Sequence, residues 1–180
     1  MISKSLSSKE TAMSLSMYQV SVPVFVRALN VLSTLLKKGE EHAAATGAVP
    51  DVLLGARLAD DMLPLSAQVQ RASDASKLCV ARLCGVDAPK FEDNEASFQQ
   101  LQERIANTIA FLESVPQAQF DGAEARDVTL AFGSFSQSFT GQSYLLTFAL
   151  PNFYFHITTA YGILRAQGVK LGKLDFLGPF

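Results

Sequence analysis

The side chains best suited to chemistry are a histidine and the asparagine four residues before it. Asn152 and His156 lie within the apolar and aromatic stretch 149–169. Side chains four residues apart project from one face of a helix, as two metal ligands on one helix do. The amide oxygen of asparagine is a weak, neutral ligand, so two interpretations stay open. His156 either binds a metal, or it is a core residue that hydrogen-bonds to a neighbouring polar group.

Few other residues are available to complete such a site. The sequence contains only two histidines, so three imidazoles cannot meet within one chain, and a mixed site would need other ligands. His42 belongs to a polar helix end, where the helix dipole favours it. Asp60 and Asp61 precede the second long helix, and one of them is expected to cap it. Asp61 is therefore the candidate acid for a site with His156, and Gln68 is a further polar group that could face a pocket.

Other sequence features mainly argue against classes of function. No nucleophile elbow, P-loop, dinucleotide-binding fingerprint or HExxH motif occurs. The net charge is −2 without a run of Lys or Arg, which argues against nucleic acid as a partner, because phosphates demand clustered positive charge. Tyr154 and Tyr161 could donate to an anion, although such residues more often pack in a core or interface. Cys79 and Cys84 match no zinc spacing, so we expect reduced, buried thiols in a cytoplasmic protein.

One long segment, residues 128–164, contains no charged residue. Part of it has about the length of a membrane span. It also contains Pro151, Asn152 and His156, and such residues are costly or disruptive in lipid. We therefore expect no membrane partner. The segment is interpreted as the floor of a core that also contributes to a subunit interface.

Apolar periodicity predicts an all-α protein. Four long helices are expected over about residues 21–46, 60–84, 95–115 and 152–167. The third is capped by Asn94, and Arg104 falls outside its apolar stripe. A short helix over 141–151 precedes the last one, and a small β-hairpin over 128–139 precedes that helix. The result is a four-helix bundle, up-down-down-up or up-down-up-down, with an irregular end from residue 169. We expect residues 1–16 to be a flexible tail and residues 17–180 to be a single domain.

Four stretches of the sequence resemble one family. They read "SMYQVSVPVFVRALNVL", "RLADDMLPLSAQVQRASDASK", "FEDNEASFQQLQERIANTIAFLESV" and "YLLTFALPNFYFHITTAYGILRAQGVKLGKLDFLG". Together they resemble an uncharacterised domain-of-unknown-function family within the DinB-like superfamily of four-helix bundles. The resemblance extends from Met17 to Gly178. It implies a bundle that is often dimeric, whose better-known relatives bind a divalent metal through three histidines. Some of those relatives are thiol-dependent transferases or isomerases.

The resemblance implies a site that this chain only partly retains. The superfamily places one histidine on the second helix and two on the last helix. His156 matches the second histidine of the last helix, and Asn152 stands where the first would be. The second helix has no histidine, and Asp61, or Gln68 further in, is the nearest polar residue. Either the metal is lost, or oxygen-rich ligands select a harder ion.

Two hypotheses for function follow from the resemblance and the residues together. The first is a metal-dependent enzyme, of the thiol-dependent transferase or hydrolase type, that uses His156 with Asn152 and Asp61. The second is a homodimeric binding module with a degenerate metal site, which buries its C-terminal third in a partner copy and accepts a small molecule in the bundle. We favour the second, and with it a protein without a metal cofactor.

Overall fold

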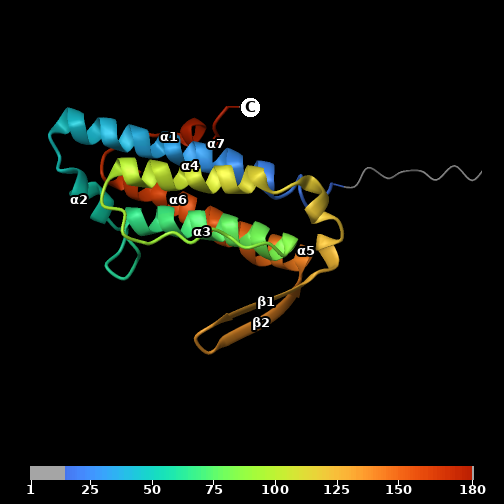
Figure 1. Cartoon of the computed structure of the whole chain (residues 1–180). Helices are drawn as coiled ribbons and strands as arrows, with labels where there is room; N and C mark the ends of the chain where they lie inside the picture. The colour runs from blue at the N-terminus through green and yellow to red at the C-terminus, as the bar shows by residue number, and fades with distance from the viewer. Residues whose placement is uncertain (1–14, 180) are drawn as a thin grey trace, which may run out of the picture.

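The computed structural model describes residues 15–179, and its centre is a bundle of four long helices (Figure 1). These are α1 (Val22–Thr46), α3 (Leu65–Cys84), α4 (Phe98–Ser114) and α6 (Leu150–Ala166). Both α1 and α3 pack against α4 and α6, which confirms the four-helix bundle. Most of the predicted tail, residues 1–14, lies outside the described residues.

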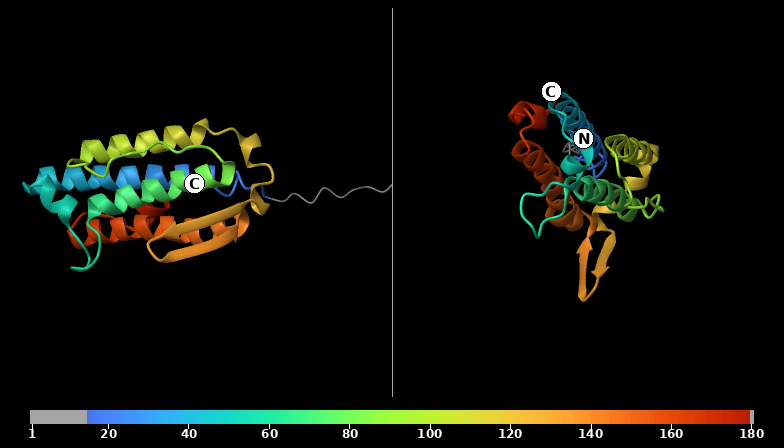
Figure 2. Two further views of the ribbon diagram at one scale, coloured as in Figure 1. Left: turned by 60° about the horizontal axis from the view of Figure 1, so that its bottom comes forward. Right: turned by 90° about the vertical axis from the view of Figure 1, so that its left-hand side faces the viewer.

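The chain runs through the bundle in the order up-down-down-up. In Figure 1, α1 runs from right to left, α3 and α4 both run from left to right, and α6 returns to the left. The segment 85–97 therefore travels back along the bundle between two parallel helices, as the left view of Figure 2 shows. Of the two predicted topologies, the structure adopts this one.

Shorter elements complete the fold. A short helix, α2 (Pro50–Gly55), joins α1 to the loop before α3, and 3₁₀ turns at Gln117–Phe120 and Ala123–Ala125 follow α4. The predicted hairpin is confirmed, with β1 (Asp127–Phe132) antiparallel to β2 (Phe135–Thr140) and Leu130 opposite Gln137. Val128 and Leu130 are buried, and the hairpin projects from the bundle beside α3 and α6 (Figure 2).

The second and third long helices start later than the sequence predicted. Asp60 and Asp61 lie in an exposed turn, and α3 begins only after Pro64, whose backbone is extended with ψ of 169°. The third helix is capped not by Asn94 but by Ser97, whose hydroxyl accepts a hydrogen bond from the Gln100 amide at 3.2 Å. Several cap-forming residues stand near each start, and the sequence alone does not rank them.

The last two predicted helices are one continuous helix. The chain passes from α5 (Gly141–Tyr144) through a π-helical turn, Leu145–Ala149, directly into α6. The Leu150 amide bonds to the Leu145 carbonyl, and this wider turn precedes Pro151, which has no amide hydrogen to donate. The predicted break at Pro151 is therefore wrong.

The C-terminal segment was predicted to be irregular, and this is only partly correct, because the segment contains the short helix α7 (Lys173–Leu177). This helix lies on α1, where Lys38 Nζ is 2.6 Å from Asp175 Oδ1. Within residues 15–179, none of the helices has both the length and the apolar character needed to cross a bilayer.

Candidate functional site

His156 lies against Gln68, a residue 88 positions earlier on α3. The distance from His156 Nδ1 to Gln68 Oε1 is 2.8 Å. The Gln68 side chain is buried, and its Nε2 donates to the Leu63 carbonyl oxygen at 3.0 Å. This second bond fixes the amide so that its oxygen faces the imidazole. Since that oxygen can only accept, Nδ1 carries the hydrogen and Nε2 keeps its lone pair.

The surroundings favour the neutral form of this imidazole. Burial lowers the pKa of His156, and the positive charge of Arg71 lowers that pKa further. The His156 side chain is therefore a neutral group with a fixed tautomer near pH 7. Its Nε2 can therefore act as a base or as a hydrogen-bond acceptor.

Asn152 lies one turn earlier on α6, half-buried. It lines a pocket of about 490 Å³ enclosed by α3, the α5–α6 helix and the hairpin, which Arg71 also lines. Arg71 thus lines the same pocket as Asn152, and its positive charge also acts on His156.

Asp61 is not brought to this site. It is exposed in the turn before α3, and no hydrogen bond or ion pair joins it to another residue in the range 15–179. Gln68, the other polar residue considered on this helix, contacts His156 instead. The partner of the histidine is therefore a neutral amide and not a carboxylate.

The remaining candidates lie away from His156. His42 is in the last turns of α1, next to Gly168, and Tyr161 packs edge-on against Phe176 with ring centroids 5.7 Å apart. Both cysteines are free and buried, as predicted. Burial raises the pKa of the Cys84 thiol to about 11, so it is protonated at neutral pH.

The donor set around His156 does not suit a divalent metal. Within residues 15–179, no three side chains of His, Cys, Asp or Glu gather where they could hold one ion. The Gln68 oxygen already accepts a hydrogen bond from the imidazole, and the Asn152 side chain is neutral. The positive charge of Arg71, which acts on His156, would also repel a metal cation. Metal sites of this kind rely on several imidazole or carboxylate ligands. The residues present therefore do not fit the three-histidine metal centre of the superfamily.

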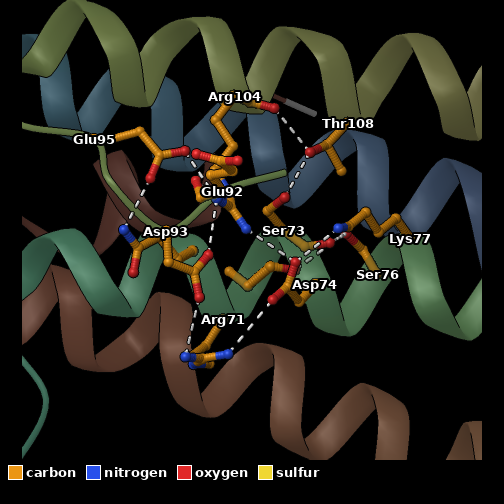
Figure 3. A network of polar contacts seen from close by, with 12 residues as sticks. Arg71, Ser73, Asp74, Ser76, Lys77, Glu92, Asp93, Glu95, Arg104 and Thr108 are labelled. Carbon is orange, nitrogen blue, oxygen red and sulfur yellow. Dashed lines mark hydrogen bonds and ion pairs between the residues drawn. The ribbon is translucent and has the colours of Figure 1, made fainter. Parts of the chain in front are cut away.

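A second polar cluster, which sequence analysis missed, surrounds Arg104 on α4 (Figure 3). Although it was predicted to lie outside the apolar stripe, Arg104 is only 3% exposed. Its guanidinium is 2.9 Å from Asp74 on α3, 3.0 Å from Asp93 and 2.8 Å from Glu95 in the 85–97 segment. Lys77 is 2.9 Å from the same Asp74 oxygen. The cluster joins two helices and their connection.

The spacing of α4 contains the signal for this burial. Arg104 and Thr108 are four residues apart, and both are buried, with the Thr108 hydroxyl 2.7 Å from that of Ser73 on α3 (Figure 3). Phe91 supports the cluster, because Arg104 lies 5.4 Å and Lys77 4.5 Å from its ring centroid. These contacts hold the long connection against the bundle and show a structural role.

The fold defines a helical bundle of the DinB type. The chain belongs to the family described as domain of unknown function (DUF1993), whose model matches residues 17–177. It is also similar to a crystal structure, at 1.83 Å, of a DinB family member protein from Shewanella denitrificans. That chain is 40% identical with a TM-score of 0.85, over 91% of this chain and 93% of the other. A search of proteins with curated descriptions found no match.

Proposed function

We propose that this protein is a homodimeric binding module of the cytoplasm, in which a His156–Gln68 pair stands where its superfamily has a metal site. The observation that carries the proposal is the outer face of the α5–α6 helix. Leu146, Tyr154 and Phe155 are exposed there, at 50%, 37% and 56% of their surface. The two free thiols are in keeping with a reducing compartment.

The lack of charge on this face supports association with a second copy. Helices that face only water normally carry charged residues outward. The α5–α6 helix has none before Arg165, and Thr147, Pro151 and Thr158 occupy other exposed positions. Charge is depleted at the centres of interfaces. A two-fold axis would place this face against itself without like-charge repulsion.

We expect the wild-type protein to sediment as a dimer and the double variant Leu146→Glu with Phe155→Glu to sediment as a monomer. Two carboxylates at the centre of a two-fold interface meet their own copies, so the dimer affinity falls by about a hundredfold or more. Analytical ultracentrifugation over a concentration series measures this. Ala106→Glu, at an exposed position on α4, is the matched control and keeps the dimer. A wild-type monomer at all concentrations would contradict the proposal.

The alternative, a metal-dependent transferase or hydrolase using His156, Asn152 and Asp61, makes an opposite prediction about metal content. We expect tag-free protein, incubated with zinc, manganese, nickel or iron(II) and then desalted, to retain far less than one ion per chain by elemental mass spectrometry. His156→Ala should not change this value.

A restored histidine set provides the positive control. Gln68→His combined with Asn152→His presents three imidazoles from α3 and α6, and this variant should retain zinc. If the wild type retained one metal ion per chain and His156→Ala lost it, the metal-dependent alternative would be correct.

A further inference from the structure

We propose that the pocket between α3, the α5–α6 helix and the hairpin binds a small molecule with an apolar body and one anionic group, which Arg82 holds. The pocket is complete within one chain, so this inference goes beyond the proposed dimer and does not require it. The pocket volume of about 490 Å³ lies in the range typical of small-molecule sites.

The walls of the pocket are mainly apolar. Ala75 and Leu78 on α3 face Phe148 and Ala149 on the α5–α6 helix, and Leu130 and Phe132 of β1 cover the groove between them. The hairpin projects beside these two helices in both views of Figure 2. An apolar ligand body would be removed from water on three sides, which is the main source of affinity in such sites.

The charges around the pocket leave one cation without a counter-ion. Arg71, Lys77 and Arg104 are balanced by Asp74, Asp93 and Glu95, to which they are paired. Asp74 also lines the pocket, but Arg104 and Lys77 occupy its Oδ1 and Arg71 lies at its Oδ2.

Arg82 takes no part in these pairs. In the range 15–179 no ion pair joins Arg82 to a carboxylate, including Asp87, which lines the adjoining hollow with it. Its positive charge is therefore available to a ligand.

Arg82 is held in place by a phenol. Its Nη1 donates to the Tyr144 hydroxyl at 2.9 Å, and its guanidinium lies 5.8 Å from the Tyr144 ring centroid. Burial raises the pKa of Tyr144 to about 12, so the phenol is neutral and leaves the positive charge uncompensated. The planar guanidinium presents further N–H groups in a fork that matches a carboxylate or a similar anion.

A polar group stands at the far end of the same wall. Asn152 lies two helical turns, about 12 Å, beyond Tyr144 along the helix. Its side-chain amide has no hydrogen-bond partner in the part of the chain that the structure describes. The pocket therefore suits a ligand with an anionic group at Arg82, an apolar middle and a polar group at Asn152.

The test uses two fluorescent probes of nearly the same shape. 1-Anilinonaphthalene-8-sulfonate carries an anionic sulfonate, and N-phenyl-1-naphthylamine has the same rings without it. We expect the wild type to bind both saturably. Arg82→Gln should weaken the sulfonate probe by about tenfold, the loss expected for one charge-assisted contact. The affinity for the neutral probe should stay unchanged. Arg82→Lys keeps the charge without the planar guanidinium, so its affinity for the sulfonate probe should lie between those of the wild type and Arg82→Gln.

Controls separate this site from the rest of the surface. Arg165→Gln removes an exposed charge at the end of α6 and should bind both probes as the wild type does. The double variant Leu146→Glu with Phe155→Glu should also keep the sulfonate affinity, which separates this pocket from the proposed dimer face. Ala75→Phe fills the groove and should lower the affinity for both probes.

Two results would overturn the proposal. One is a sulfonate affinity for Arg82→Gln within twofold of wild type, with the variant folded by circular dichroism. The other is an equal loss of affinity of Arg82→Gln for both probes, which would assign Arg82 a packing role only.

Discussion

Arg104→Met is expected to lower the free energy of unfolding by about 3 kcal/mol, as removal of one partner from a buried ion cluster does. The Arg104 side chain is 2% exposed and lies between Asp74, Asp93 and Glu95, whose side chains are 22%, 37% and 10% exposed. Without the guanidinium these three carboxylates repel one another and lose hydrogen bonds. Urea denaturation of both proteins at pH 7 measures the difference.

Arg71→Met is the matched control, because Arg71 pairs with two of the same acids, Asp74 and Asp93. Its side chain is 46% exposed, so water screens these pairs and their loss should cost less than about 1 kcal/mol. Equal effects of the two substitutions would show that burial does not set the strength of this cluster.

The effect of Arg104→Met should also depend on pH, through Glu95. Burial alone would raise the pKa of the Glu95 carboxyl, but hydrogen bonds from Arg104 and Gln70 outweigh it and hold the pKa below its ordinary 4.5. A carboxyl with a lowered pKa stabilises the fold above its unfolded pKa, and this contribution is lost as the pH falls through the folded value. The difference between wild type and variant should therefore shrink below about pH 4.5.

Gly141→Ala is expected to destabilise the fold by about 3 kcal/mol or more, through overpacking against backbone. A Cβ at Gly141 would lie 1.9 Å from the Ala123 carbonyl oxygen and 3.1 Å from Leu83 Cδ2. The 3₁₀ turn and the start of α5 would have to separate to make room. Thermal and urea unfolding, followed by circular dichroism, report the loss.

Gly55→Ala provides the comparison for this substitution. Gly55 ends α2, and a Cβ there meets no atom within 4 Å. We expect its effect to stay within about 0.5 kcal/mol of wild type, as for other surface changes. A Gly141→Ala variant as stable as Gly55→Ala would mean that the contact with Ala123 is easily relieved.

The bundle was predictable from sequence because its signal is local. Helix α4 shows this, since Leu101, Ile105 and Leu112 repeat at helical spacing and all three are buried. The exact helix starts could not be predicted in the same way, because a cap depends on which of several neighbouring polar residues reaches the free backbone amides. Ser97, rather than Asn94, does so on α4.

The contacts of the site depend on residues far apart in the sequence. The sequence identified His156 and offered both Asp61 and Gln68 as partners, and only the folded chain brings Gln68 within 2.8 Å. Arg104 was predicted to fall outside the apolar stripe of its helix, although it lies three residues after Leu101 and four before Thr108, both of which are buried. The spacing indicates the burial of Arg104, but the acids that pair with it come from α3 and from the 85–97 segment, and no pattern within α4 identifies them.

Because α3 and α4 run parallel, the 85–97 segment that joins them must have a minimum length. An antiparallel pair of helices can be joined by a few residues, whereas this connection has to cover the length of α4, 17 residues or about 25 Å. A fully extended chain covers that distance with no fewer than about eight residues. Insertions into the segment are therefore compatible with the same architecture, but there is a shortest length below which α4 could no longer run parallel to α3.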